Sequence, residues 1–271
     1  MDTGQASRVG SLLREWRRRR RLSQLELALL ADTSARHLSC VETGRARPSR
    51  AMVLRLAAAL DVPLRERNSL LLAADYAPAY RETSLDEEEM ASIRSALDTM
   101  LTSHEPYPAV VVDRCWNVLT ANRAMSVFLD GIPSHLLEPR PNVYRMVLHP
   151  EGLISRLANR SEVRALFLDR LRREVNTTGA PAAAALYEEV SAYPVLPDEP
   201  GGAPVGRPGP IQFPLRFRTP LGELSMFSTM ATFGTPADVT LSELAIELFY
   251  PLDEFTEQAL RGLAALRETA A

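Results

Sequence analysis

Residues 23–49 read SQLELALLADTSARHLSCVETGRARPS, and this stretch decides the fold of the N-terminal part of the chain. Ser23 and Glu26 have the spacing of a capping box, in which the two residues satisfy each other's backbone amides at a helix start. The apolar helix that follows ends at a polar break, ADTS, instead of at glycine or proline. Asp32 tolerates the positive φ that a tight turn needs, and Ser34 can cap a second helix. The stretch therefore predicts two short helices that cross at a steep angle.

Apolar residues at helical spacing extend this pattern in both directions. They are Val9, Leu12, Leu13 and Trp16 before the quoted stretch, Leu38 and Val41 within it, and Val53, Leu56, Leu60, Leu71 and Leu72 after it. Gly44 suits the left-handed end of the second of the two crossing helices, and Pro63 separates the last two stripes. The sequence thus predicts five short helices within residues 1–82.

Charge divides the chain into two parts. Residues 1–82 hold 15 arginines and 9 acidic residues, a net charge of +6, whereas residues 83–271 hold 16 arginines and 25 acidic residues, a net charge of −9. A basic segment joined to an acidic one indicates that the basic part meets a polyanion such as double-stranded DNA. Uneven charge also arises by chance, so the pattern alone leaves that alternative open.

Residues 8–76 resemble the Xre-type helix-turn-helix domain, which has the lambda-repressor-like fold of five helices. The resemblance is carried by Gln24, Ala28, Leu38 and Val41 and by the run ETGRARPS that follows. Asp32 departs from the glycine that is common in the family at the turn. The resemblance implies a DNA-binding surface made of Gln24, Thr33, Ser34, Ala35, Arg36, His37, Ser39, Arg45 and Arg47.

In such a domain the third helix lies in the major groove with its first residues at the base edges. Arg36 is the best base reader, because a guanidinium can bond two acceptors of guanine at once. His37 is expected to read a base or touch a phosphate, and Gln24 to hold a phosphate at a helix N-terminus. Arg45 and Arg47 are expected to contact the DNA backbone. Plain solvation is the alternative for each arginine, and it is the favoured reading for the run Arg17 to Arg21.

Residues 83–105 predict a linker or dimerisation helix. Ser84 and Glu87 repeat the capping-box spacing, and Met90, Ile93, Leu97 and Met100 form one apolar stripe. The stripe can pair with its twin in a second copy or pack on the body of its own chain. A homodimer is expected in either case, because these domains read two half-sites of a pseudo-palindromic operator.

Residues 106–271 show strand patterns at 109–113, 116–120, 211–217, 223–233 and 242–249. Helices are predicted at 122–128, 152–160, 161–176, 182–192 and from 253 onward, and ten Pro and Gly residues within 194–210 predict an irregular connection or lid. This order predicts an α+β, PAS-like domain with an antiparallel sheet of about five strands.

The body resembles the ligand-binding domain of the MmyB-like transcription regulators over most of 106–266. The matching stretches are EPYPAVVVDRCWNVLTANRAM, RPNVYRMVLHPEG and TPLGELSMFSTMATFGTPADVTLSELAIELFYP. The resemblance implies a PAS-like pocket for a small hydrophobic, fatty-acid-like molecule. The residues expected to line it or hold its head are Val112, Trp116, Phe128, Arg145, Phe167, Tyr187, Phe213, Phe217, Met226 and Met230, with His149 and Arg216 as further partners for a carboxylate. The alternative is that the apolar residues simply fill a core and that the body is a dimerisation module without a ligand.

Other classes of protein fit poorly. The four histidines have no metal-ligand spacing, no glycine-rich phosphate loop follows a strand, and no serine has a nucleophile-elbow context. We therefore expect a regulator and not an enzyme, without metal or cofactor. The two cysteines, the lack of an apolar run of about 20 residues and the polar N-terminus predict a cytoplasmic protein away from the membrane.

Overall fold

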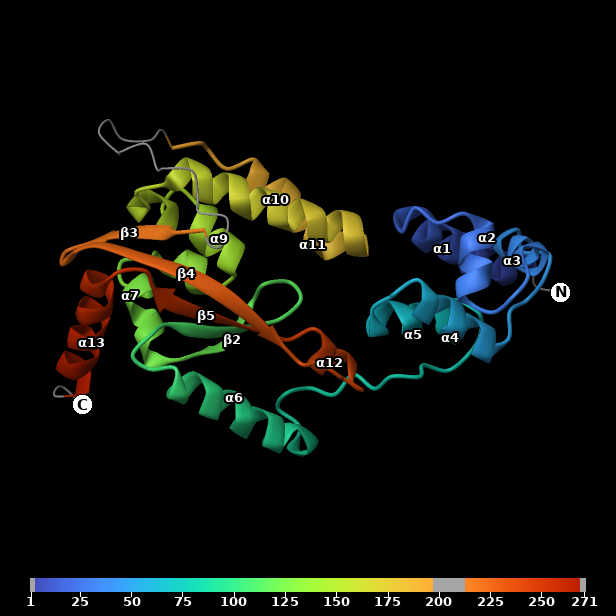
Figure 1. Ribbon diagram of the computed structural model, residues 1–271, viewed down its shortest axis with the longest axis horizontal. Helices are drawn as coiled ribbons and strands as arrows, with labels where there is room; N and C mark the ends of the chain where they lie inside the picture. Colours follow the sequence, from blue (N-terminus) through green and yellow to red (C-terminus); the bar gives the residue numbers. More distant parts are fainter. Residues whose placement is uncertain (1–2, 197–212, 269–271) are drawn as a thin grey trace. The chain divides into compact units, whose positions relative to one another are not determined.

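The computed structural model describes residues 3–196 and 213–268, and the chain forms two compact units (Figure 1). The first unit comprises Met1–Ser84 together with two short later segments, Asn176–Thr178 and Thr235–Ser242. The second comprises Leu85–Val175, Gly179–Gly234 and Glu243–Ala271. The predicted irregular connection at 194–210 lies outside the described residues from 197 onward. The sequence did not predict that two later segments join the first unit.

The first unit is built on five helices, as predicted: α1 (Thr3–Arg19), α2 (Gln24–Leu30), α3 (Ala35–Glu42), α4 (Arg50–Ala59) and α5 (Leu64–Ala73). Three of them start at a serine cap, because Ser23, Ser34 and Ser49 each accept the backbone N–H of the third residue on. Asp32 takes a φ of 47° in the break between α2 and α3, as expected for a tight turn. The apolar stripes of all five helices meet in one core.

A buried ion pair ties α1 to α3. The Arg17 guanidinium donates hydrogen bonds of 2.6 and 2.8 Å to the Glu42 carboxylate, whose side chain is 1% exposed, and the Gln24 amide donates a third of 2.8 Å. Burial by itself raises the pKa of Glu42, but these hydrogen bonds and the charge of Arg17 outweigh it and hold the pKa below its ordinary value. The two helices also meet closely at Gly10, where an added Cβ would lie 2.3 Å from the Val41 carbonyl oxygen.

The second unit contains the predicted antiparallel sheet, with the strand order β2-β1-β5-β4-β3. Its strands are β1 (Ala109–Val112), β2 (Val118–Ala121), β3 (Leu215–Thr219), β4 (Gly222–Thr232) and β5 (Ala245–Pro251). β5 lies in the middle, with Ile246 opposite Val111 of β1 and Leu248 opposite Thr229 of β4. Along β5, Ile246, Glu247 and Phe249 are buried and the other residues are half-buried, so side chains on both of its faces are withdrawn from water.

The other helices are α6 (Ala91–Ser103), α7 (Ser126–Leu129), α8 (Ser134–Leu137), α9 (Val143–Leu148), α10 (Arg160–Thr178), α11 (Pro181–Ser191), α12 (Val239–Ser242) and α13 (Glu254–Glu268). Three single turns of 3-10 helix accompany them, η1 (Glu88–Met90), η2 (Arg123–Met125) and η3 (Leu153–Arg156). In Figure 1, α9 and α10 lie over the sheet, and side chains from both meet the strands in one large core.

Three predicted elements of the body are wrong in detail. The helix predicted at 152–160 is only the turn η3, because the chain is drawn to the sheet: the Ala158 N–H bonds the Arg216 carbonyl at 2.8 Å, and Asn159 bonds the Pro214 carbonyl. The strand predicted at 242–249 begins at Ala245, since α12 occupies the preceding residues. The strand predicted at 116–120 begins at Val118, because Trp116 takes a φ of 64° in the hairpin turn.

The linker helix also starts later than predicted. The chain is not helical at Ser84, and η1 and α6 follow from Glu88. Within the stripe, Met90 and Leu97 are buried inside the chain, Ile93 is half-buried, and Met100 is 40% exposed. The stripe therefore packs mostly on its own chain, which favours that alternative over pairing with a twin.

Candidate nucleic-acid interface and ligand cavity

The exposed face of α3 is the candidate nucleic-acid interface. Arg36 is exposed, and Ala35, His37 and Ser39 are half-buried beside it. Among the described residues, none forms a hydrogen bond or ion pair with the Arg36 guanidinium, so its donors remain available. Ser34 accepts the His37 N–H at 3.1 Å and thereby fixes the start of α3. The arrangement presents an unengaged guanidinium at the first turn of a rigid helix.

The turn before α3 is held by its own backbone. The Thr33 N–H bonds the Ala28 carbonyl at 2.9 Å, which closes α2, while the Ser34 side chain is occupied as the cap of α3. Gln24 was predicted to hold a phosphate, but its amide N–H₂ already donates a hydrogen bond to the buried Glu42. Its carboxamide oxygen and the N-terminus of α2 are the parts that a phosphate could use.

The remaining predicted arginines differ in how firmly they are held. Arg45 is exposed and touches only its neighbour, with Nε 3.0 Å from the Thr43 hydroxyl. Arg47 donates to the Ala74 carbonyl at 3.0 Å and to Asp75 at 3.1 Å, and its guanidinium lies 5.6 Å from the Tyr76 ring centre. Arg47 therefore ties the loop after α3 to the end of α5, whereas Arg45 is free to reach outward.

Some arginines of the run at the end of α1 form hydrogen bonds and ion pairs within the first unit. Arg17 pairs with the buried Glu42, and Arg20 donates to the carbonyls of Leu60 and Asp61, both at 2.8 Å, at the end of α4. Trp16 packs beneath the guanidinium groups of Arg19 and Arg20 at 5.2 and 5.5 Å. These contacts indicate that the arginines stabilise the packing of the first unit, and none of the contacts requires bound DNA.

The second unit contains a cavity of about 630 Å³ between the sheet and its helices. The described residues that line it are Val110, Met125, Phe128, Val143, Met146, Val147, Leu153, Leu157, Val163, Leu166, Phe167, Arg170, Arg173, Phe213, Leu215, Phe217, Phe227, Ser228, Thr229, Met230, Glu247 and Phe249. Most of this wall is aliphatic or aromatic. A cavity of this size and chemistry suits an apolar ligand with one polar group.

Half of the predicted ligand residues lie in this wall: Phe128, Phe167, Phe213, Phe217 and Met230. The other five are not among its described residues. Val112 and Met226 are buried in the surrounding core, and Tyr187 packs against it. Trp116 contacts the wall through Arg170, and Arg145 is engaged by Glu189 with two hydrogen bonds of 2.7 Å.

The polar groups of the wall gather around Glu247 of β5. Its side chain is 5% exposed, accepts a hydrogen bond of 2.7 Å from the Ser228 hydroxyl and lies 4.0 Å from an Arg170 nitrogen. Burial raises the pKa of Glu247, against the opposing effects of Ser228 and Arg170. A buried carboxyl group, a hydroxyl and a guanidinium therefore face the otherwise apolar cavity from β5, β4 and α10.

Trp116 and Tyr144 lie next to this polar end of the cavity. The Arg170 guanidinium lies 4.2 Å from the Trp116 ring centre, and the Trp116 indole N–H bonds Glu174 at 2.9 Å. Among the described residues, none besides Glu247 forms a hydrogen bond or ion pair with the Arg170 guanidinium, so most of its N–H donors remain available. The Tyr144 hydroxyl is buried with no hydrogen-bond partner among the described residues, and burial raises its pKa.

The other predicted carboxylate partners lie elsewhere. Arg216 reaches Glu223 at 3.5 Å, and its Nε is buried without a partner among the described residues. His149 comes together with His135 and Glu151, their ligand atoms lying within 4.8 Å of one another. The sequence spacing did not predict this group. The Glu151 N–H already occupies Nδ1 of His149 at 3.2 Å, and His135 and Glu151 are exposed.

Arg170, Ser228 and Glu247 were missed by reasoning from sequence. Glu247 alternates with apolar neighbours in β5, which is the pattern of a solvent-facing position on a half-buried strand. No local signal marks its burial, because a central strand of an antiparallel sheet can keep one face in water. Arg170 lies among charged residues of α10, and nothing in its local sequence distinguishes it.

These two sites define a class: a regulator that pairs a helix-turn-helix with a ligand-binding domain. Residues 8–70 match the model of a helix-turn-helix domain, and residues 93–263 match that of the MmyB-like transcription regulator ligand binding domain. The second match spans more than half of the chain, so the protein belongs to the MmyB-like transcription regulators, and these are not enzymes.

No curated protein matches the chain. Among solved structures, "Structure of an RNA-binding Light-Oxygen-Voltage Receptor" aligns with 13% identity and a TM-score of 0.24, covering 98% of this chain and 65% of that one. The chain thus spans slightly less than two thirds of the length of that structure. None of the described helices combines the length and apolarity needed to cross a bilayer.

Proposed function

We propose that the protein is a cytoplasmic homodimer that binds a pseudo-palindromic DNA operator and responds to a small hydrophobic, fatty-acid-like ligand. The DNA contacts are assigned to Gln24, Thr33, Ser34, Ala35, Arg36, His37, Ser39, Arg45 and Arg47. The observation that carries the proposal is the pairing of an unengaged Arg36 on α3 with a large apolar cavity in the same chain. Two half-sites require two copies, because one small domain reads few base pairs.

The anionic head group of the proposed ligand is assigned to Arg170. The guanidinium is partly withdrawn from water, lies over the Trp116 ring, and retains N–H donors in the geometry that a carboxylate accepts. Burial raises the pKa of Glu247, which weakens the competition of this carboxyl group with an anionic head group for Arg170. The aromatic and aliphatic wall takes the hydrocarbon chain.

The DNA half of the proposal is tested by selecting bound duplexes from a random pool with the full-length chain. We expect enrichment of a palindrome with two half-sites, and a 2:1 protein-to-duplex stoichiometry. Arg36→Ala should weaken binding to the selected duplex by about 1–3 kcal/mol and relax the preference at one position of each half-site. If Arg36→Ala binds selected and random duplexes as the wild type does, the placement of α3 in the major groove is wrong.

The ligand half is tested by thermal unfolding of the full chain with sodium dodecanoate. A ligand present at a hundred times its Kd stabilises the native state by about 2.7 kcal/mol, which is easily seen as a higher Tm. The rival is a body that serves only dimerisation. A series of fatty acids and alcohols that leaves the Tm unchanged would support that rival.

A further inference from the structure

The segment that joins the two central strands of the cavity is part of the first unit. β4 supplies Phe227, Ser228, Thr229 and Met230 to the cavity wall, and β5 supplies Glu247 and Phe249. The chain between these strands includes Thr235–Ser242, which belongs to the compact unit of the five N-terminal helices. The strands that would hold a ligand therefore run directly into the unit that would hold DNA.

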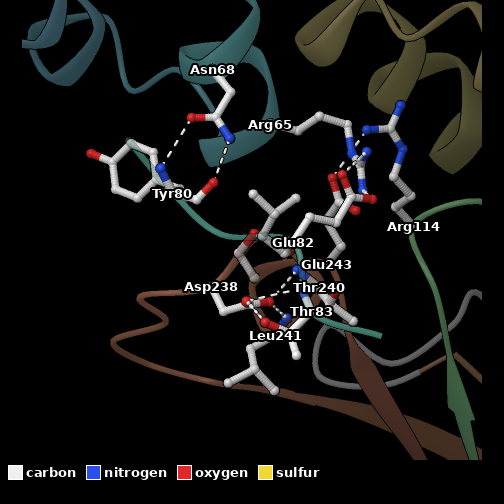
Figure 2. Close-up of polar contacts among 12 residues, drawn as sticks. Arg65, Asn68, Tyr80, Glu82, Thr83, Arg114, Asp238, Thr240, Leu241 and Glu243 are labelled. Atoms are coloured by element: carbon white, nitrogen blue, oxygen red, sulfur yellow. Dashed lines mark hydrogen bonds and ion pairs between the residues drawn. The ribbon is translucent and has the colours of Figure 1, made fainter. Parts of the chain in front are cut away.

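Within the first unit this segment is held by Asp238. One carboxylate oxygen accepts the Thr83 backbone N–H at 3.1 Å and the Thr83 hydroxyl at 2.8 Å (Figure 2). The other accepts the Thr240 N–H at 2.8 Å and so starts α12. The Val239 N–H bonds the Arg81 carbonyl at 2.8 Å, and Thr83 and Val239 are buried. We call this pairing of 81–83 with 238–239 the latch.

The latch continues into α5 through residues 79–82. The Asn68 side chain accepts the Tyr80 N–H and donates to the Tyr80 carbonyl at 2.7 Å (Figure 2). It also accepts the Ala79 N–H at 2.9 Å. The Arg65 guanidinium pairs with Glu82, with one hydrogen bond of 2.8 Å. Both anchors lie on α5, which packs against α1 and α4 in the same core. These hydrogen bonds and the backbone of residues 79–83 thus join α5 to the connection between β4 and β5.

We infer that the latch couples the cavity to the DNA-binding helices, so that ligand binding and DNA binding alter each other through Asp238 and Thr83. The inference rests on the proposed function and adds its route of regulation. A ligand that shifts β4 or β5 strains the segment they share, and the two hydrogen bonds to Thr83 pass that strain to α5. Coupling of this kind is reciprocal, so DNA must also change the strands of the cavity.

The test uses this reciprocity and needs no ligand. Hydrogen–deuterium exchange of residues 223–232 and 245–251 is measured in the full chain with and without the selected duplex. In the wild type we expect the duplex to change exchange of these amides by about fivefold or more, the lower range of allosteric coupling. In Thr83→Val, which keeps the shape and the backbone N–H bond but loses the hydroxyl donor, the change should shrink, while Thr83→Ser should retain it.

A second variant guards against a general loss of structure. Val239→Pro removes the third hydrogen bond of the latch, which the Val239 N–H donates to the Arg81 carbonyl at the first residue of α12, where a helix tolerates proline. The same shrinkage in a folded Val239→Pro chain supports the latch. An equal response in wild type and Thr83→Val, or none in the wild type despite tight duplex binding, overturns the coupling and leaves the proposed function standing. Failure of the wild type to bind any duplex overturns both.

Discussion

Single side chains decide what each site can recognise. Arg36 and Arg170 are both arginines on helices, yet one is exposed on α3 and the other is 33% exposed at the wall of a cavity. An exposed guanidinium suits base edges that come from solution. A guanidinium held against an indole and facing apolar side chains suits the head of an amphiphile, since water competes less for its donors.

Arg170→Leu should weaken dodecanoate binding by about 1.5–3 kcal/mol, the range for a hydrogen bond to a charged group. Dodecanol has the same chain without the charge, so its affinity should change little. Calorimetric titration of both compounds into both proteins gives the comparison. Equal losses for the acid and the alcohol would mean that Arg170 only shapes the cavity.

Glu42 links the stability of the five-helix unit to pH. Its pKa is lowered in the folded state, so its stabilising effect is complete above the unfolded value of about 4.3 and is lost as the pH falls through the folded value. Glu42→Gln should therefore lower the free energy of unfolding at pH 7 by about 1–3 kcal/mol, with a smaller deficit near pH 3. Urea unfolding of both proteins at the two pH values measures it, and a deficit independent of pH would contradict the role of the charge.

At the scale of elements, α1 packs closely against α3, the helix proposed to read DNA. Gly10 allows this approach, because a Cβ there would meet the Val41 carbonyl oxygen at 2.3 Å. Gly262 on α13 makes a matched control, since an added Cβ meets nothing within 4 Å there. The two glycines lie in helices and differ mainly in their neighbours.

Gly10→Ala should lower the free energy of unfolding by about 1–3 kcal/mol, the cost of overpacking, and should also weaken DNA binding. Gly262→Ala should instead be neutral or stabilising by up to about 1 kcal/mol, because alanine is the better helix former. Denaturant unfolding of both variants tests the pair. A Gly10→Ala chain as stable as the wild type would mean that α1 can move away from α3 at little cost.

The helices of the first unit were predictable because each carries its own signals. Ser23, Ser34 and Ser49 mark three starts, and Asp32 marks the break, all within a few residues of the features they control. The cavity was only half predictable. Its aromatic wall follows from apolar patterns, but its polar end joins α10, β4 and β5, whose residues Arg170 and Glu247 are distant in sequence. Their proximity depends on the packing of α10 over a central strand.

At the scale of the whole molecule, charge and fold divide at the same place. The net charge of +6 lies on residues 1–82, and the first compact unit runs to Ser84 before its two later segments. The acidic remainder should contribute nothing favourable to DNA binding. Affinity for DNA should then come from the small basic unit and depend strongly on salt.

The logarithm of the DNA association constant should fall linearly with the logarithm of salt concentration. Arg45→Ala should reduce the slope by about one for each half-site, as expected on losing a phosphate contact, and leave the base preference intact. Fluorescence anisotropy with the selected duplex at several salt concentrations gives both slopes. A shallow slope for the wild type would argue against contacts between the basic unit and the DNA phosphates.

The placement of the two tryptophans gives each unit its own optical reporter. The chain contains only Trp16, in the core of the five helices, and Trp116, beneath Arg170 at the end of the cavity. Replacing either one with phenylalanine leaves emission from one unit alone. Intrinsic tryptophan fluorescence can therefore show, without an attached dye, whether the two units unfold together or one after the other. It can also show which unit responds to an added amphiphile.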